Sequence, residues 1–146
     1  MDNNVYNGFI EGNISAPFIA YTIAKHKFKP QVGAHQLFMG QVRADTVGDR
    51  TVTAMEYTAY EPMAKKKFNE IKEAAFSKFD ISCVHFLHSL GRVDVGDICL
   101  FILVSSPHRK AAREALDYMV EEFKAKVPIF GKELFGEDGH QWKTNN

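Results

Sequence analysis

The chain has 146 residues, and its 18 lysines and arginines are balanced by 18 aspartates and glutamates, so the formal net charge is zero. A neutral chain lacks the general electrostatic attraction to nucleic acids or anionic membranes that a strongly basic protein has. The length is that of one ordinary domain and suffices to bury a core without metal ions or disulfide bonds. We therefore expect one domain over residues 1–146, with any cationic site confined to a local cluster.

The two cysteines, Cys83 and Cys99, have neither CxxC spacing nor flanking metal-ligand patterns. Two buried, reduced thiols in a cytoplasmic protein are the simplest interpretation, and no disulfide bond is expected. The N-terminus lacks a basic segment followed by an apolar core, and no apolar run reaches the ~18 residues of a membrane span. These features predict a cytoplasmic protein with no membrane partner.

The spacing of apolar residues predicts an α+β sandwich. Period-two alternation indicates strands, apolar residues three and four apart indicate helices, and Gly, Pro or polar clusters separate them. Three helices are expected: one capped by Ser15, one starting at Glu61-Pro62, and one starting at Ser106-Pro107. The expected strands cover residues 5–10, 33–42, 51–60, 82–90 and 98–104, with an edge strand at 141–143 and a polar loop at 43–50.

The segment from Ser105 to Glu133 is the strongest candidate for a functional element, because its helix carries cations at both ends. Ser106 is a good N-cap and Pro107 fits the first helical position. His108 and Arg109 then follow where free N–H groups and the helix dipole attract anions. At the far end, a second cationic group consists of Lys124, Lys126 and Lys132, and Pro128 ends the helix.

Most familiar catalytic and metal-binding motifs are absent. The chain has no GxGxxG, GxxxxGK[ST], HExxH or GxSxG sequence, which excludes the simplest nucleotide-binding, zinc-protease and hydrolase interpretations. His85 and His88 are three residues apart on a predicted strand, so their side chains face opposite sides and cannot readily share a metal. No metal site is expected.

A set of cations remains at the ends of the predicted elements. Each one alone is most simply a surface charge, but their joint placement near the core boundary favours the floor of a pocket. Cations without catalytic carboxylates fit an anionic, phosphorylated substrate, with a lysine as proton donor or charge stabiliser. The candidates are Arg43, His108, Arg109, Lys124 and Lys132.

Five segments resemble, in the same order, those of the large, catalytic subunit of molybdopterin synthase. Their combination is specific, although each segment alone is a weak signal. The resemblance implies an α/β-hammerhead-type domain with a mixed, mainly antiparallel sheet and three helices. The segments are FMGQVR at 38–43, MEYTAYEPMA at 55–64, HSLGRVDVGD at 88–97, SSPHR at 105–109 and KAKVPIF at 124–130.

The resemblance also implies an activity and a partner. The enzyme would be a sulfurtransferase, active as a homodimer flanked by two small ubiquitin-like sulfur-carrier subunits in a heterotetramer. The carrier's C-terminal Gly-Gly tail would bring a thiocarboxylate into a pocket. Two sulfur transfers would convert cyclic pyranopterin monophosphate, precursor Z, into the dithiolene of molybdopterin without a cofactor. The alternative is a non-catalytic dimeric module that binds a phosphorylated ligand or a partner's C-terminal tail.

By the same resemblance, Lys124 matches the principal catalytic lysine, which would transfer a proton and stabilise charge. Gly131 stands where the family has a second functional lysine. Lys132 is therefore the expected second catalytic residue, with Lys126 as the other substitute. The expected substrate-binding residues are Arg43, Phe38 and Lys126, together with His108 and Arg109, which the family can supply across the dimer interface.

Overall fold

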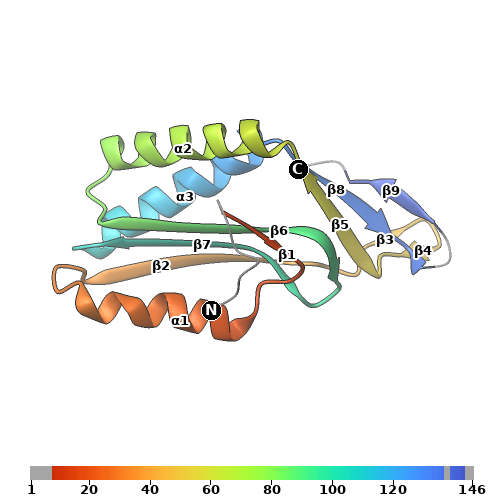
Figure 1. Cartoon of the computed structure of the whole chain (residues 1–146), viewed down its shortest axis with the longest axis horizontal. Helices are drawn as coiled ribbons and strands as arrows, with labels where there is room; N and C mark the ends of the chain where they lie inside the picture. Colours follow the sequence, from red (N-terminus) through yellow and green to blue (C-terminus); the bar gives the residue numbers. More distant parts are fainter. Residues whose placement is uncertain (1–7, 137–138, 144–146) are drawn as a thin grey trace.

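The structure, a computed structural model of the chain, describes residues 8–136 and 139–143. Within these residues three α-helices, a mainly antiparallel main sheet and a separate two-stranded sheet confirm the predicted α+β class (Figure 1). No helix among them is long and apolar enough to cross a membrane. In chain order the elements are β1 (Phe9–Glu11), α1 (Ala16–Ala24), the 3-10 helix η1 (Lys25–Phe28), β2 (Ala34–Gln41), β3 (Thr46–Val47), β4 (Arg50–Thr51), β5 (Ala54–Ala59), α2 (Glu61–Lys78), β6 (Cys83–Asp94), β7 (Ile98–Ser106), α3 (Arg109–Lys126), β8 (Ile129–Leu134) and β9 (His140–Trp142).

The long strand β6 joins two halves of the main sheet, whose order is β2-β7-β6-β5-β8-β9. Residues 83–88 of β6 pair with β7, and residues 91–94 pair with β5. The short strand β1 lies parallel to β6, whereas the other pairs in this sheet are antiparallel. In Figure 1 the half containing β2, β7 and β6 lies between helices, and β5, β8 and β9 extend beyond them.

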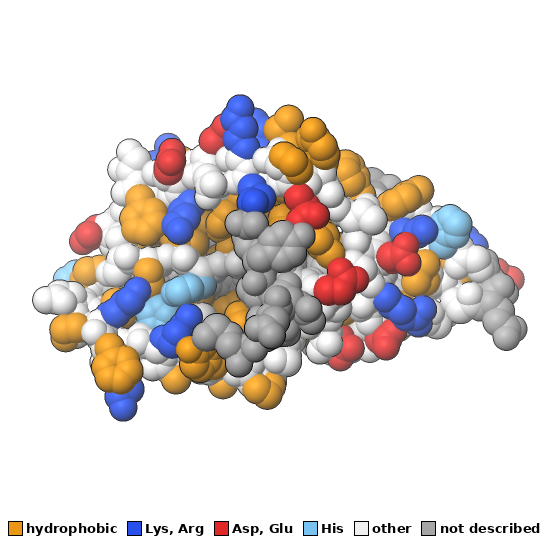
Figure 2. All heavy atoms as spheres, viewed as in Figure 1, with side chains coloured by type: hydrophobic (Ala, Val, Ile, Leu, Met, Phe, Trp, Pro, Cys, Tyr) orange, Lys and Arg blue, Asp and Glu red, His pale blue; other side chains and the backbone are white. Residues whose placement is uncertain are grey.

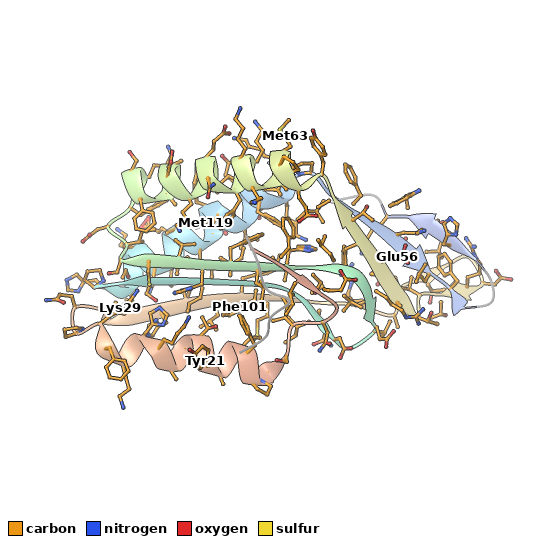
Figure 3. The ribbon with its side chains drawn as sticks, viewed as in Figure 1. Tyr21, Lys29, Glu56, Met63, Phe101 and Met119 are labelled. Atoms are coloured by element: carbon orange, nitrogen blue, oxygen red, sulfur yellow. The ribbon has the colours of Figure 1, made fainter. Side chains whose placement is uncertain are left out.

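The helices cover both faces of the first half of the sheet (Figure 1). Because side chains alternate along a strand, β7 contributes to two separate packed layers. Ile102 packs in the cluster that includes Met119 of α3, whereas Phe101 packs in the cluster that includes Ile19 of α1. Figure 3 shows Phe101 on the α1 side and Met119 on the side of α2 and α3.

The start of α3 differs from the sequence prediction. Ser106 is not the N-cap: it is the last residue of β7, is fully buried, and donates its hydroxyl to the carbonyl of His108. The helix begins at Arg109, and His108 occupies the cap position without a side-chain cap bond. Pairing between Ser106 and Ala34 of β2 extends the strand, so tertiary pairing outweighs the local capping preference of serine.

Some of the other predicted helix and strand boundaries are confirmed and others are wrong. Ser15 caps α1, accepting a hydrogen bond from the Phe18 amide at 3.2 Å, and β9 is the expected edge strand. Residues 129–134 were not predicted as a strand, yet they form β8, which pairs with β5. The loop at 43–50 includes the small β3–β4 hairpin. Of the strand predicted at 5–10, residues 5–7 lie outside the described residues.

Candidate functional site

A cavity of about 880 Å³ opens where the C-terminal end of α3 meets the second half of the sheet. Strands β2, β5 and β8 form its walls, and the end of β9 closes one side. Its lining combines aromatic side chains with cations. The lining side chains used below are Phe38, Met39, Arg43, Met55, Tyr57, His88, Cys99, Lys124, Lys126, Phe130, Gly131, Glu133, Trp142 and Lys143.

The inner wall of the cavity is a packed group of neutral polar side chains. The Tyr57 hydroxyl donates to Cys99 Sγ at 3.4 Å, and the Cys99 thiol donates to the Gly40 carbonyl at 3.5 Å. Burial raises the pKa of Tyr57 well above its usual range, and the adjacent Cys99 adds to this shift. Tyr57 therefore stays protonated near neutral pH and serves as a hydrogen-bonding wall rather than as an acid.

His88 lies beside Tyr57, and their rings meet edge to face with centroids 4.9 Å apart. Burial lowers the pKa of His88 to about 4, and the positive charge of Lys124 contributes to the lowering. The imidazole is therefore neutral near pH 7. Its Nδ1 lies 2.7 Å from the Ser89 carbonyl, which can only accept, so Nδ1 carries the proton.

Lys124 belongs to the last turn of α3 and lines this cavity. Part of its side chain is accessible to solvent, yet the cavity walls surround enough of it to lower the pKa of its ammonium group. The nearby Cys99 opposes this shift, and the positive charge of Lys143 adds to it. Lys124 consequently releases a proton more readily than an ordinary surface lysine.

Two further cations lie at the cavity and share one carboxylate. Arg43 Nε is 3.3 Å from an oxygen of Asp45, and Lys143 Nζ is 3.6 Å from the other. The Lys143 backbone amide also donates to the Gly131 carbonyl at 2.8 Å, which ties the end of β9 to β8. Arg43 was predicted from the sequence; Lys143 was not, because its only sequence signal was a place in an edge strand.

A lysine at position 131 would require the side chain of Met55 to move. A Cβ atom at this position would lie 2.6 Å from Met55 Cε and 3.2 Å from the Tyr57 ring. The side chain of Met55 thus occupies the space that a longer side chain at position 131 would need. Lys143, directly after β9, brings a further ammonium group to this cavity.

Neither of the two expected substitutes aims its ammonium group into the cavity. Lys132 does not line it: its Nζ lies 3.3 Å from Glu56 and 5.6 Å from the centre of the Trp142 ring. In Figure 3 Glu56 lies in the half of the sheet beyond the helices. Lys126 does line the cavity, but its Nζ bonds Glu122 at 2.9 Å along α3.

His108 and Arg109 lie at the opposite end of α3 and are exposed. Arg109 precedes Lys124 by fifteen helical positions, which corresponds to roughly 22 Å at 1.5 Å per residue. One copy of the chain therefore does not bring this pair into its own cavity. Phe38, by contrast, lines the cavity and is half-buried.

Known proteins resemble this chain along most of its length. The family described as MoaE protein matches residues 14–126. A molybdopterin synthase catalytic subunit from Bacillus subtilis is 43% identical over 126 residues, covering 86% of this chain and 79% of that protein. The crystal structure of molybdopterin synthase from Staphylococcus aureus superposes with a TM-score of 0.81 at 32% identity, covering 96% of this chain and 98% of that one.

A second solved structure supports the fold alone. It is a protein–protein complex of subunits 1 and 2 of molybdopterin-converting factor from Helicobacter pylori, and the matching chain has a TM-score of 0.81 at 22% identity. The alignment covers 94% of this chain and 90% of that one.

Proposed function

The chain belongs to the MoaE family, and we propose that it transfers sulfur from a carrier's C-terminal thiocarboxylate to cyclic pyranopterin monophosphate. Its similarity to a molybdopterin synthase catalytic subunit and to a solved molybdopterin synthase extends over most of the chain. The family inferred from the five sequence segments is confirmed. The observation that carries the proposal is the cavity, where Lys124, Arg43 and Lys143 converge beside a neutral aromatic wall. Both proposed substrates are anions, and such anions bind favourably to fixed cations.

Arg43 is the proposed anchor for an entering anion. Its side chain is 74% exposed and pairs with Asp45, so an incoming phosphate or thiocarboxylate can replace that carboxylate without dismantling the core. Guanidinium groups bind such planar or tetrahedral anions through two parallel hydrogen bonds. Phe38 and Lys126 would form the adjacent wall against the pterin.

Lys124 is the proposed proton donor and charge stabiliser. In the proposed step the thiocarboxylate sulfur bonds to a pterin side-chain carbon and displaces oxygen from it. Water then cleaves the acyl–sulfur bond, so the carrier leaves as a carboxylate that holds the water oxygen while sulfur stays on the pterin, and negative charge develops on oxygen during this hydrolysis. An ammonium group held beside the reacting atoms stabilises such charge, and cavity walls that remove part of its water strengthen the interaction. Its lowered pKa also brings proton release closer to neutral pH.

Lys143 is proposed as the second lysine of the reaction. It would take the role that the family gives to a lysine at position 131. Its amide is held by Gly131, its ammonium group lies near Asp45, and its charge acts on Lys124. Lys132 remains the sequence-based candidate for the same role. The ion pair of Lys132 with Glu56 of β5 favours a structural role for Lys132.

A partner's tail is the proposed occupant of the cavity mouth. Met39, Phe130 and Trp142 line the cavity and are 51%, 53% and 57% exposed, which is unusual for large apolar side chains. A small ubiquitin-like carrier with a C-terminal Gly-Gly could cover them while its tail enters. The proposed assembly is a heterotetramer, in which a homodimer supplies His108 and Arg109 from one copy to the cavity of the other, and its proposed location is the cytoplasm.

The decisive experiment is reconstitution. Purified protein, thiocarboxylated carrier and cyclic pyranopterin monophosphate are incubated, and the products are analysed by mass spectrometry. We expect a pterin that has gained two sulfur atoms as a dithiolene. Absence of any sulfur-containing pterin, with the carrier still bound, would favour the alternative of a non-catalytic module that holds a phosphorylated ligand or a partner's tail.

A further inference from the structure

A second group of chemically reactive side chains lies on the other face of the sheet, under α1 and η1. We call His26, His35, Cys83 and His85 the histidine–cysteine cluster. Cys83 and His85 are two residues apart on β6, so their side chains lie on the same face of the sheet. His26 reaches them from η1. The His26 ring lies 5.0 Å from the His35 ring and 4.9 Å from the His85 ring, centre to centre.

Three of these residues present ligand atoms to a common point. One ligand atom each from His26, Cys83 and His85 lies within 4.8 Å of the others, and His26 Nε2 is 3.2 Å from Cys83 Sγ. Metal–nitrogen and metal–sulfur bonds of ~2.0–2.3 Å place neighbouring ligand atoms roughly 3.4–3.8 Å apart. Small side-chain rotations would therefore bring all three onto one ion.

The tautomer of His26 is already the one that a metal ligand needs. Its Nδ1 lies 2.9 Å from the Thr22 carbonyl, which can only accept, so Nδ1 carries the proton. Nε2 then presents its lone pair toward Cys83. A ring N–H held by a backbone carbonyl is the usual second contact of metal-binding histidines, and His26 is itself 5% exposed.

His85 supplies a second, independent observation. Its Nε2 is one of the buried side-chain nitrogen and oxygen atoms that lack a hydrogen-bond partner among the described residues. Such atoms are uncommon in native proteins and call for a missing partner.

We propose that His26, Cys83 and His85 bind one thiophilic closed-shell cation, with loss of the Cys83 thiol proton to solvent. Two imidazoles and one thiolate form a ligand set used by copper sites, and thiolates select Cu(I) or Zn(II). The ion would tie η1 to the start of β6. This proposal does not depend on the sulfur-transfer activity, because the cluster faces away from the cavity.

The surrounding charges favour the ion of lower charge. Lys25 and Lys27 flank the ligand His26 within η1. One thiolate leaves a bound Zn(II) with a net charge of +1 but leaves Cu(I) neutral, so repulsion from these lysines is smaller for Cu(I). Figure 2 shows histidine side chains with lysine or arginine side chains close by on the face viewed, over the strands next to α1.

The test uses the full-length protein, stripped of metal and kept anaerobic. Cu(I) and, separately, Zn(II) are titrated in competition with a chromogenic chelator, and thermal unfolding is followed with and without metal. We expect one equivalent of Cu(I), bound more tightly than Zn(II), and a rise in the unfolding temperature. Cys83→Ser and His85→Gln should each weaken binding by at least about 10-fold, the scale seen even for outer-shell partners of metal sites.

Cys99→Ser is the matched control, since it removes the chain's other cysteine, which lies at the cavity instead. It should bind Cu(I) as the unmodified protein does. Failure of the metal-free protein to take up one equivalent of either ion would overturn the proposal. So would equal affinity in Cys83→Ser, and uptake of Zn(II) without Cu(I) would overturn the preference for the ion of lower charge.

Discussion

The two ends of α3 carry similar sequence signals but have different surroundings. At the C-terminal end Lys124 lies in a cavity whose walls lower its pKa, whereas at the N-terminal end His108 and Arg109 are exposed. One helix thus has one end beside a cavity of its own chain and the other end exposed on the surface. Cation clusters in a sequence therefore identify candidate sites, but the enclosure that changes their chemistry comes from other elements.

The largest effect is expected at the cavity end. Lys124→Ala should lower kcat by about 10²–10⁴-fold, the range for loss of a general acid or charge stabiliser, with the fold retained. Single-turnover sulfur transfer measures the rate, and circular dichroism and carrier binding serve as controls. Unfolding of the variant would show that Lys124 is structural, and an unchanged rate in a folded variant would remove its catalytic role.

The exposed N-terminal end of α3 should affect the reaction only through the cavity of a second copy of the chain. Arg109→Ala is expected to raise KM for the pterin about 10–100-fold, because hydrogen bonds to charged groups contribute ~1.5–3 kcal/mol. Mixing Arg109→Ala with Lys124→Ala should restore about one quarter of the sites, since a two-fold dimer pairs one intact Lys124 with one intact Arg109. No recovery after subunit exchange would place Arg109 outside the active site.

Lys143 is the charged neighbour of Lys124 in the cavity, and its removal tests how that charge affects Lys124. Lys143→Met should lower kcat/KM by roughly 10-fold, the effect of losing one charged contact. Because the Lys143 charge lowers the pKa of Lys124, its removal should move the corresponding limb of the pH–rate profile to higher pH. Lys132→Met is the matched control, with a change of less than about 3-fold and no shift of that limb. The reverse result would assign the second-lysine role to Lys132.

Stability should also respond to pH at the cavity end. His88 has a pKa of about 4 in the folded protein, below its ordinary value of 6.5, so folding favours its neutral form. Its contribution is fully present above about pH 6.5 and is lost as the pH falls toward 4, by up to about 3 kcal/mol. Urea denaturation across this window should show a weaker pH dependence in His88→Gln, whereas His108→Gln should behave like the unmodified protein.

Local signals alone identified several parts of this protein. The cap at Ser15, the start of α2 and the apolar strand β7 follow from periodicity and capping, which act over a few residues. The five segments indicated the family, and Lys124 and Arg43, two of the candidate residues, both line the cavity. These features depend on neighbours that are close in the chain, so the sequence displays them directly.

Only the tertiary structure decided the rest, because it depends on pairing between distant segments. Ser106 joined β7 through its pairing with Ala34, and β8 formed by pairing with β5. Met55 filled the space at Gly131, and the end of β9 brought Lys143 to Lys124. His26 met Cys83 across 57 positions of chain. The free energy of such contacts comes from burial and hydrogen bonding that no short window of sequence contains.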